Sequence, residues 1–165
     1  MDKGAYWDIV EAARAEGSDA SEVAQRVEAN LRARPAEVVF EFVQQQGQLM
    51  AESYSWELWG AAYIVCGGCS DDGFDYFRGW LLAQGRDAFE AVVAAPDSLA
   101  DLIVAGDEAE AEDMLAAGAN AYKTLTGSYP KGAGTKLPAL GEGWDFDDAE
   151  EMKRRYPRCW AKFHE

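Results

Sequence analysis

The sequence contains little of what common catalytic machinery needs, with one histidine, His164, and three cysteines. A serine or cysteine hydrolase needs a base next to its nucleophile, and that base is most often histidine. A single histidine at the penultimate position is a poor candidate for this role. No P-loop and no dinucleotide-binding glycine motif occurs either. The sequence therefore predicts no cofactor, and it leaves open whether the protein is an enzyme.

Basic residues and long apolar runs are also scarce. The chain has 15 Lys and Arg against 30 Asp and Glu, a net charge of −15. Nucleic-acid affinity depends largely on basic side chains that displace counterions, so we expect no nucleic-acid binding. Anionic membrane surfaces are disfavoured for the same reason, and no stretch approaches the ~18 apolar residues of a membrane span. The charge instead favours solubility, cations and basic partners.

The beginning of the sequence lacks a basic head followed by an apolar run, so we expect no secretion signal. An odd number of cysteines without such a signal indicates reduced thiols. Both observations predict a cytoplasmic protein. Of the 165 residues, 48% are hydrophobic and 27% are charged, which is the composition of a globular chain.

No segment shows the alternating pattern of a β-strand, whereas apolar residues recur at helical spacing along the chain. We therefore predict an all-α fold, a single compact domain over residues 1–165 with about seven or eight helices. A Gly- and Pro-rich segment, residues 127–143, is predicted to be a surface loop within it. Pro157 is expected to kink or divide the last helix. The helices are expected near residues 4–16, 19–34, 35–54, 56–66, 70–84, 86–95, 108–126 and 147–164, with a short helical turn near 96–103.

The centre of the chain resembles a known family. The resemblance rests on YSWELWGAAY (54–63), GGCSDDGFDYFRGW (67–80), QGR (84–86), PDSLA (96–100) and WDFDD (144–148). These segments are similar to a bacterial, mainly actinobacterial family known as domain of unknown function 4240. The resemblance extends over nearly the whole chain from about Gly4. It implies a small intracellular protein, and it implies no particular reaction.

Three carboxylates at the start of the helix predicted over 70–84 are the first candidate site. Asp71 and Asp75 are four residues apart and share a helical face, and Asp72 is rotated by about 100° from Asp71. Together with Glu57 they offer oxygen ligands to Mg²⁺ or Ca²⁺, and Arg78 can hold a carboxylate or phosphate with two hydrogen bonds. The alternative is structural: Ser70, Asp71 and Asp72 cap the helix, and Asp75 pairs with Arg78.

The cysteines are the second candidate. Cys66 and Cys69 form a C-x-x-C pair, and with Cys159 and His164 they supply a Cys₃His set suitable for zinc. Cys159 and His164 are about 140° apart around a helix, so this set requires a bend. A thioredoxin-like redox role requires a preceding strand, which is not predicted. Asp71 and Asp72 also disfavour a thiolate.

The same helix carries two kinds of aromatic residue. Phe74, Phe77 and Leu81 have the spacing of a buried face. Tyr76 and Trp80 form another face, and Trp and Tyr are typical residues of protein interfaces.

We favour a non-catalytic intracellular interaction or regulatory module with another protein as its partner. The alternative is a metal or small-ligand site in residues 57–78, with or without enzymatic activity. A third reading is an acidic mimic that blocks a nucleic-acid-binding protein. The sequence does not determine the oligomeric state.

Overall fold

The protein is described by a computed structural model over residues 1–164, in which every regular element is helical. The fold is all-α, as predicted, with more and shorter helices than expected. The described elements are α1 (Lys3–Arg14), α2 (Ala20–Arg32), α3 (Ala36–Glu52), α4 (Trp56–Val65), α5 (Asp71–Ala83), α6 (Arg86–Ala94), the 3₁₀ turn η1 (Pro96–Ser98), α7 (Leu99–Leu102), α8 (Glu112–Thr126), α9 (Ala149–Arg155) and α10 (Pro157–His164).

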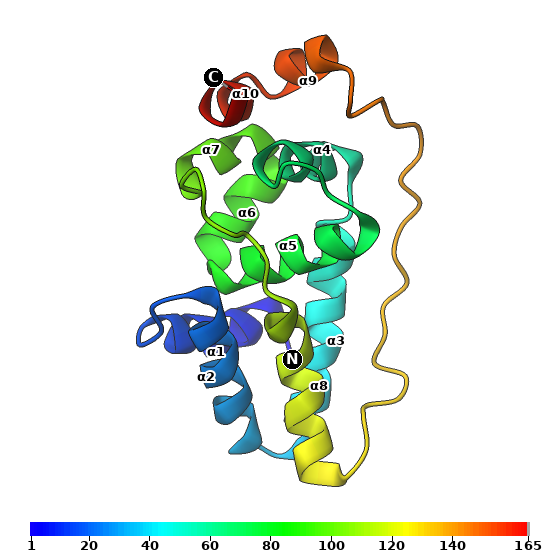
Figure 1. The fold of residues 1–165 in the computed structure, drawn as a ribbon. Helices are drawn as coiled ribbons and strands as arrows, with labels where there is room; N and C mark the ends of the chain where they lie inside the picture. The colour runs from blue at the N-terminus through cyan, green and yellow to red at the C-terminus, as the bar shows by residue number, and fades with distance from the viewer. Residues whose placement is uncertain (165) are drawn as a thin grey trace.

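The helices form two connected groups with a third element at one end (Figure 1). Helices α1, α2, α3 and α8 pack together, and α8 lies against both α2 and α3. Helices α4 to α7 form the second group, and α5 joins the two by packing against α8. The last two helices, α9 and α10, cover the end of the second group by contacts with α4, η1 and α7.

Side-chain caps fix several helix starts. Asp19 accepts a hydrogen bond from the Glu22 backbone at 2.8 Å, and Glu22 accepts one from the Ser18 backbone at 2.8 Å. This reciprocal pattern satisfies N–H groups that a helix start leaves unpaired. Ser70 likewise accepts a hydrogen bond from Gly73 at 3.1 Å and caps α5. Both caps agree with the sequence, in which Asp19 stands three residues before Glu22 as in a capping box and Ser70 is a favoured N-cap residue.

Helix α8 begins at Glu112, four residues later than predicted. The residues before it are extended, with Ala109 and Ala111 buried and Glu108 and Glu110 exposed. The Ala111 backbone N–H donates to the Tyr76 carbonyl of α5 at 2.9 Å, which holds this stretch outside the helix. The prediction was wrong here because a tertiary hydrogen bond outweighs the helix propensity of Ala and Glu.

The C-terminal helix is divided at Pro157, as expected, because proline has no N–H to continue the ladder. Its first half is capped by Asp148, which accepts from the Glu151 backbone at 3.2 Å. Asp147 stands three residues before Glu150, which is the spacing of a capping box, so the sequence predicts a cap by Asp147. That side chain instead accepts a hydrogen bond from the Tyr63 hydroxyl at 2.5 Å, so the cap moves by one residue.

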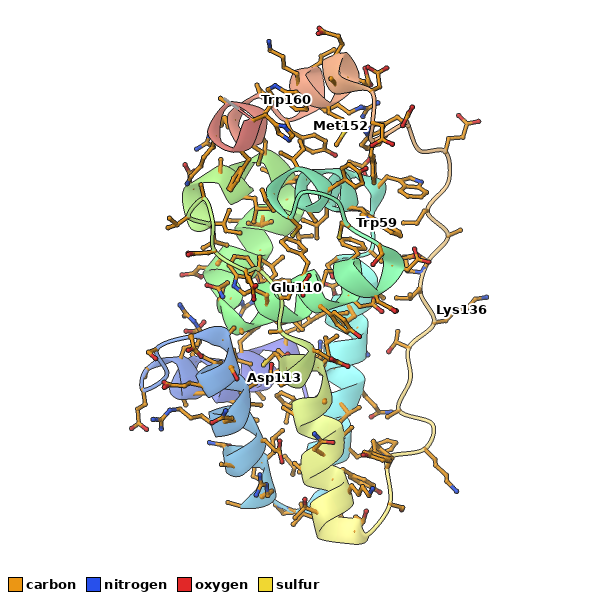
Figure 2. The ribbon with its side chains drawn as sticks, viewed as in Figure 1. Trp59, Glu110, Asp113, Lys136, Met152 and Trp160 are labelled. Atoms are coloured by element: carbon orange, nitrogen blue, oxygen red, sulfur yellow. The ribbon has the colours of Figure 1, made fainter. Side chains whose placement is uncertain are left out.

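Residues 127–148 contain no regular element. We call residues 127–140 the strap and residues 141–164 the C-terminal unit. The strap runs along the outside of the molecule from the end of α8 toward α9 (Figure 1). Figure 2 shows its Lys136 side chain extending away from the body.

The core is continuous from α1 to α10. It includes fully buried residues of both groups and of the C-terminal unit, among them Trp7, Phe42, Leu81, Met152 and Cys159. Within residues 1–164 we find no helix with the length and apolar character needed to cross a membrane.

Candidate functional site

Helix α5 buries the face that its sequence predicts. Phe74 and Phe77 have no exposed surface, and Leu81 follows them into the core. The Phe74 ring stacks on Trp59 of α4, with ring centroids 4.7 Å apart. The aromatic density of this segment is therefore mostly a packing feature that joins α4 to α5.

Arg78 is the unexpected residue of this helix because its side chain is buried with only 1% exposed. One guanidinium nitrogen donates to the Met50 carbonyl in the last turn of α3 at 2.6 Å, and another donates to Asp75. The guanidinium carbon lies 4.5 Å from the centre of the Phe74 ring and 5.1 Å from that of Tyr54. The positive group thus caps the negative end of α3 and stacks on two rings.

These contacts contradict the expectation that Arg78 binds a ligand or partner. Burial lowers the pKa of its guanidinium, and the pair with Asp75 opposes that effect. Arginine remains charged under such conditions because its ordinary pKa lies above 12. Arg78 ties α3 to α5, and its pairing with Asp75 is the structural alternative considered from the sequence.

The three carboxylates of α5 do not converge on a cavity. Asp71 and Asp72 are exposed in the first turn, where acids suit the positive end of the helix dipole. Asp75 is half-exposed and pairs with Arg78. Glu57 lies on α4 beside Pro96 and Tyr156. Among residues 1–164, no three His, Cys, Asp or Glu side chains are placed to hold a metal ion.

The Cys₃His set considered for zinc is not assembled either, because its members lie apart in the described part of the chain. Cys66 and Cys69 flank the turn between α4 and α5 and are half-buried. Cys159 is buried in α10, where its sulfur donates to the Asp97 carbonyl at 3.5 Å. His164 is exposed, and its ring stacks on Trp160 at 4.2 Å. The four predicted ligands therefore do not meet.

Tyr76 and Trp80 differ in accessibility. Tyr76 is half-buried next to Glu112, whose charge is the main reason that the pKa of the Tyr76 hydroxyl is raised. Trp80 retains only 9% exposure, because its ring packs on Phe77 with centroids 5.9 Å apart. The expectation of an open Tyr76–Trp80 face is therefore too broad, since only a small part of Trp80 is accessible.

The exposed part of Trp80 lines a groove of about 560 Å³. The walls come from the start of α2, the end of α5, the end of α7 and the connection before α8. We call this the acidic groove, because it carries four carboxylates and no basic side chain. Its residues are Ser18, Asp19, Ala20, Ser21, Trp80, Gln84, Leu102, Ile103, Asp107, Glu108 and Glu110.

Three of the four carboxylates have no partner within the described chain. Asp107, Glu108 and Glu110 are exposed, and their side chains form no hydrogen bond or ion pair with residues 1–164. Figure 2 shows Glu110 on the connection that leads into α8, and Asp113 at the first turn of that helix. Asp113 accepts a hydrogen bond from Ser21 at 2.8 Å, which closes the groove against α2.

The groove acids were not among the residues selected from the sequence. The signal was present as an alternation of Glu and Ala in residues 108–112, which fits an extended segment with alanines inward. Glu and Ala also favour a helix, and these residues were therefore assigned to the helix predicted over 108–126. Asp19 was recognised only as a cap, a role it also has in the structure.

Comparison with known families identifies the chain. Residues 1–124 match the family described as Protein of unknown function (DUF4240). The chain belongs to this family. The family inferred from the sequence is thereby confirmed, over residues 1–124, whereas the segment 144–148 lies outside the match. No curated protein matches the chain, and no solved structure does.

The DUF4240 match ends inside α8, two residues before the end of that helix. The acidic groove lies entirely within the matched part, since its residues fall between 18 and 110. The strap and the C-terminal unit lie outside it. The groove is therefore built by the DUF4240 region of the chain, and the C-terminal unit is added to one end of it.

The C-x-x-C thiols of this DUF4240 protein are poor nucleophiles. Burial, with the Glu110 charge as a lesser cause, raises the pKa of Cys66 to about 11, and burial raises that of Cys69 to about 12. A raised pKa leaves the thiols neutral near pH 8. At this pH, Cys66 has about a hundredfold less thiolate than a free thiol. A thiolate of higher pKa is intrinsically more reactive, which partly offsets this loss. We therefore expect Cys66 to be alkylated about tenfold more slowly than a free thiol.

This prediction is checked by iodoacetamide labelling at pH 8, read by mass spectrometry, with the urea-unfolded chain as the control. The rate for the folded chain should rise with pH as the thiols ionise, up to about pH 11. Equal rates for the folded and unfolded chains would show that neither thiol is protected.

Proposed function

We propose that this protein is a non-catalytic interaction module that binds a basic segment of another protein in the acidic groove. The observation that carries the proposal is the charge of the groove. Three exposed carboxylates, Asp107, Glu108 and Glu110, line it without partners, and Asp19 adds a fourth at the opposite wall. Such a concentration of one charge raises the local concentration of a positively charged ligand and speeds its association.

Trp80 supports a peptide in preference to a bare cation. Its indole N–H forms no hydrogen bond with the described residues and is not one of their buried unpaired groups, so water reaches it although the ring is about nine-tenths buried. A ligand that covers this N–H has to supply an acceptor, because a buried tryptophan N–H usually has one. A peptide supplies both groups that the groove lacks, namely cationic side chains for the carboxylates and carbonyl oxygens for Trp80. A metal ion or a polyamine supplies no acceptor.

A binding role also agrees with the chemistry of the chain. The thiols are held neutral by burial, and the histidine side chain is stacked on Trp160 at the surface. The acidic surface disfavours nucleic acids and anionic membranes. We place the protein in the cytoplasm, where its thiols remain reduced.

The test uses a short peptide of alternating arginine and glycine, acetylated and amidated at its ends, with binding measured by titration calorimetry. We expect the groove variant D107N/E108Q/E110Q to bind at least about tenfold more weakly, because three charge contacts of roughly 0.5 kcal/mol each are lost. Binding to the natural chain should weaken as salt is added. Trp80→Phe removes the N–H donor and should weaken binding while keeping an aromatic ring in place.

The matched control is E37Q/E142Q/E150Q, which makes the same change in net charge at exposed acids outside the groove. This variant should bind the peptide as the natural chain does. A peptide in which glutamine replaces arginine should not bind. If the two triple variants bind arginine peptide equally, the attraction is a property of the whole surface and the groove has no special role.

A further inference from the structure

The C-terminal unit is attached to the body by a small set of well-defined contacts. The first turn of α10 has no cap from its own neighbours. Asp97 of η1 supplies it by accepting from the Cys159 backbone at 2.9 Å and the Arg158 backbone at 3.1 Å. Lys162 then donates to the Ala100 carbonyl at 2.6 Å. A helix start that depends on another element is ordered only when that element is present.

A second set of contacts joins the C-terminal unit to α4. The Tyr156 hydroxyl donates to the Glu57 carbonyl at 2.6 Å, and its ring lies against Gly60, where a Cβ would come within 2.4 Å of the hydroxyl oxygen. Trp56 donates to the Gly141 carbonyl at 3.0 Å, and Tyr63 donates to Asp147. Every one of these contacts joins residues 141–164 to α4, η1 or α7. We call that surface the α4 face.

The strap contributes little to this attachment. Residues 129–140 form no hydrogen bond to the rest of the described chain, and Ala133 is their only buried member. Tyr129 contacts the Lys123 ammonium at 4.4 Å, and Thr135 lies against Gly47 of α3. The strap thus sets the path of the chain, whereas the C-terminal unit makes the specific contacts.

The strap must span the distance from the end of α8 to the bound Gly141. Helices α3 and α8 are antiparallel, since Phe40 lies beside Tyr122 and Gln46 donates to the Leu115 carbonyl at 3.2 Å. The end of α8 therefore lies near the start of α3, and Gly141 is bound beyond the end of α3. The 17 residues of α3 make this span about 25 Å at 1.5 Å per residue.

From these observations we infer that the α4 face of one copy accepts the C-terminal unit of a second copy, so that two chains exchange their C-terminal units and form a dimer. The exchange recreates every specific contact, because both sides of each contact are unchanged and only the path of the strap differs. The resulting interface is self-complementary, with each chain giving one unit and accepting one. Such a dimer would carry two acidic grooves.

Shortening the strap tests this inference directly. Deletion of residues 129–136 leaves four residues between Ser128 and Gly141, which reach roughly 17 Å and cannot cross the span of about 25 Å. The C-terminal unit can then dock only on another copy. We expect the shortened chain to be a dimer by size-exclusion chromatography with light scattering. Adding Asp97→Ala to the shortened chain should return it toward monomer, because the α10 cap is lost.

The control replaces residues 129–136 with an equally long Gly- and Ser-rich sequence, which should leave the chain monomeric at low concentration. A shortened chain that stays monomeric overturns the inference. If the shortened chain does not fold, the inference is tested on the natural chain by mixing two differently labelled samples. Biotin-labelled and unlabelled copies are mixed at high concentration, and mixed dimers are collected on streptavidin. Recovery of labelled copies alone also overturns it.

Discussion

Replacing Arg78 by alanine should lower the free energy of unfolding by about 3–5 kcal/mol. The change removes a large buried side chain, leaves the Met50 carbonyl with only the longer hydrogen bond from the Ser53 hydroxyl at 3.2 Å, and ends the stacking on Phe74 and Tyr54. A core cavity alone has a cost of this order, and the loss of a charged hydrogen bond adds to it. Urea unfolding followed by circular dichroism gives the measurement.

Two variants separate the causes. Asp75→Asn should cost less than about 1 kcal/mol, because that carboxylate is half-exposed and solvent screens the pair. Arg78→Met fills much of the space and should be milder than Arg78→Ala, but it still removes the charged hydrogen bond to the Met50 carbonyl and leaves only the one from Ser53. Arg26→Ala is the surface control, since Arg26 pairs only with exposed Glu16. If Arg78→Ala is no worse than Arg26→Ala, the buried guanidinium is not holding α3 and α5 together.

Replacing Gly79 by alanine is expected to have the second-largest effect, a loss of about 2–3 kcal/mol. A Cβ at Gly79 would lie 2.4 Å from the Ala111 carbonyl oxygen and 3.0 Å from Leu115. The nearest atom belongs to the backbone, so relief requires α5 and the start of α8 to separate, and overpacking of this kind costs a few kcal/mol. This cost exceeds the ~1 kcal/mol that alanine gains over glycine within a helix.

The Gly79→Ala substitution should also change the shape of the acidic groove. Moving Ala111 also moves Glu110 and Glu108, which precede it on the extended connection. We therefore expect Gly79→Ala to weaken binding of the arginine peptide as well as to lower the melting temperature. Gly134→Ala is the matched control, because no atom lies within 4 Å of the added Cβ. Equal melting temperatures for the two variants would contradict the close contact between α5 and the α8 connection.

Much of the fold follows from local signals in the sequence. Ser70 and Asp19 indicate helix starts, because their side chains accept hydrogen bonds from the first turn. Pro157 indicates a break, because it has no backbone N–H. The buried face of α5 follows from the spacing of Phe74 and Phe77. Each of these features depends on residues a few positions apart, and local sequence is sufficient for them.

The features that local sequence did not reveal depend on distant partners. Arg78 looks like a surface arginine until the end of α3 is placed beside it, 28 residues earlier in the chain. The start of α8 is set by the Tyr76 carbonyl, and the cap of α10 by Asp97. The acidic groove combines α2, α5, α7 and the connection before α8, so no window of sequence contains it.

The dependence of α10 on Asp97 has a consequence for synthesis of the protein on the ribosome. The α4 face is translated well before the unit that covers it, since the 38 residues 103–140 separate α7 from the C-terminal unit. At ~5–20 residues per second, these residues take roughly 2–8 s to be made. During that interval Trp56, Gly60 and Tyr63 lack their final cover, and this surface is open to a chaperone. Synthesis of the C-terminal unit ends this exposure, because α10 gains its cap as it docks.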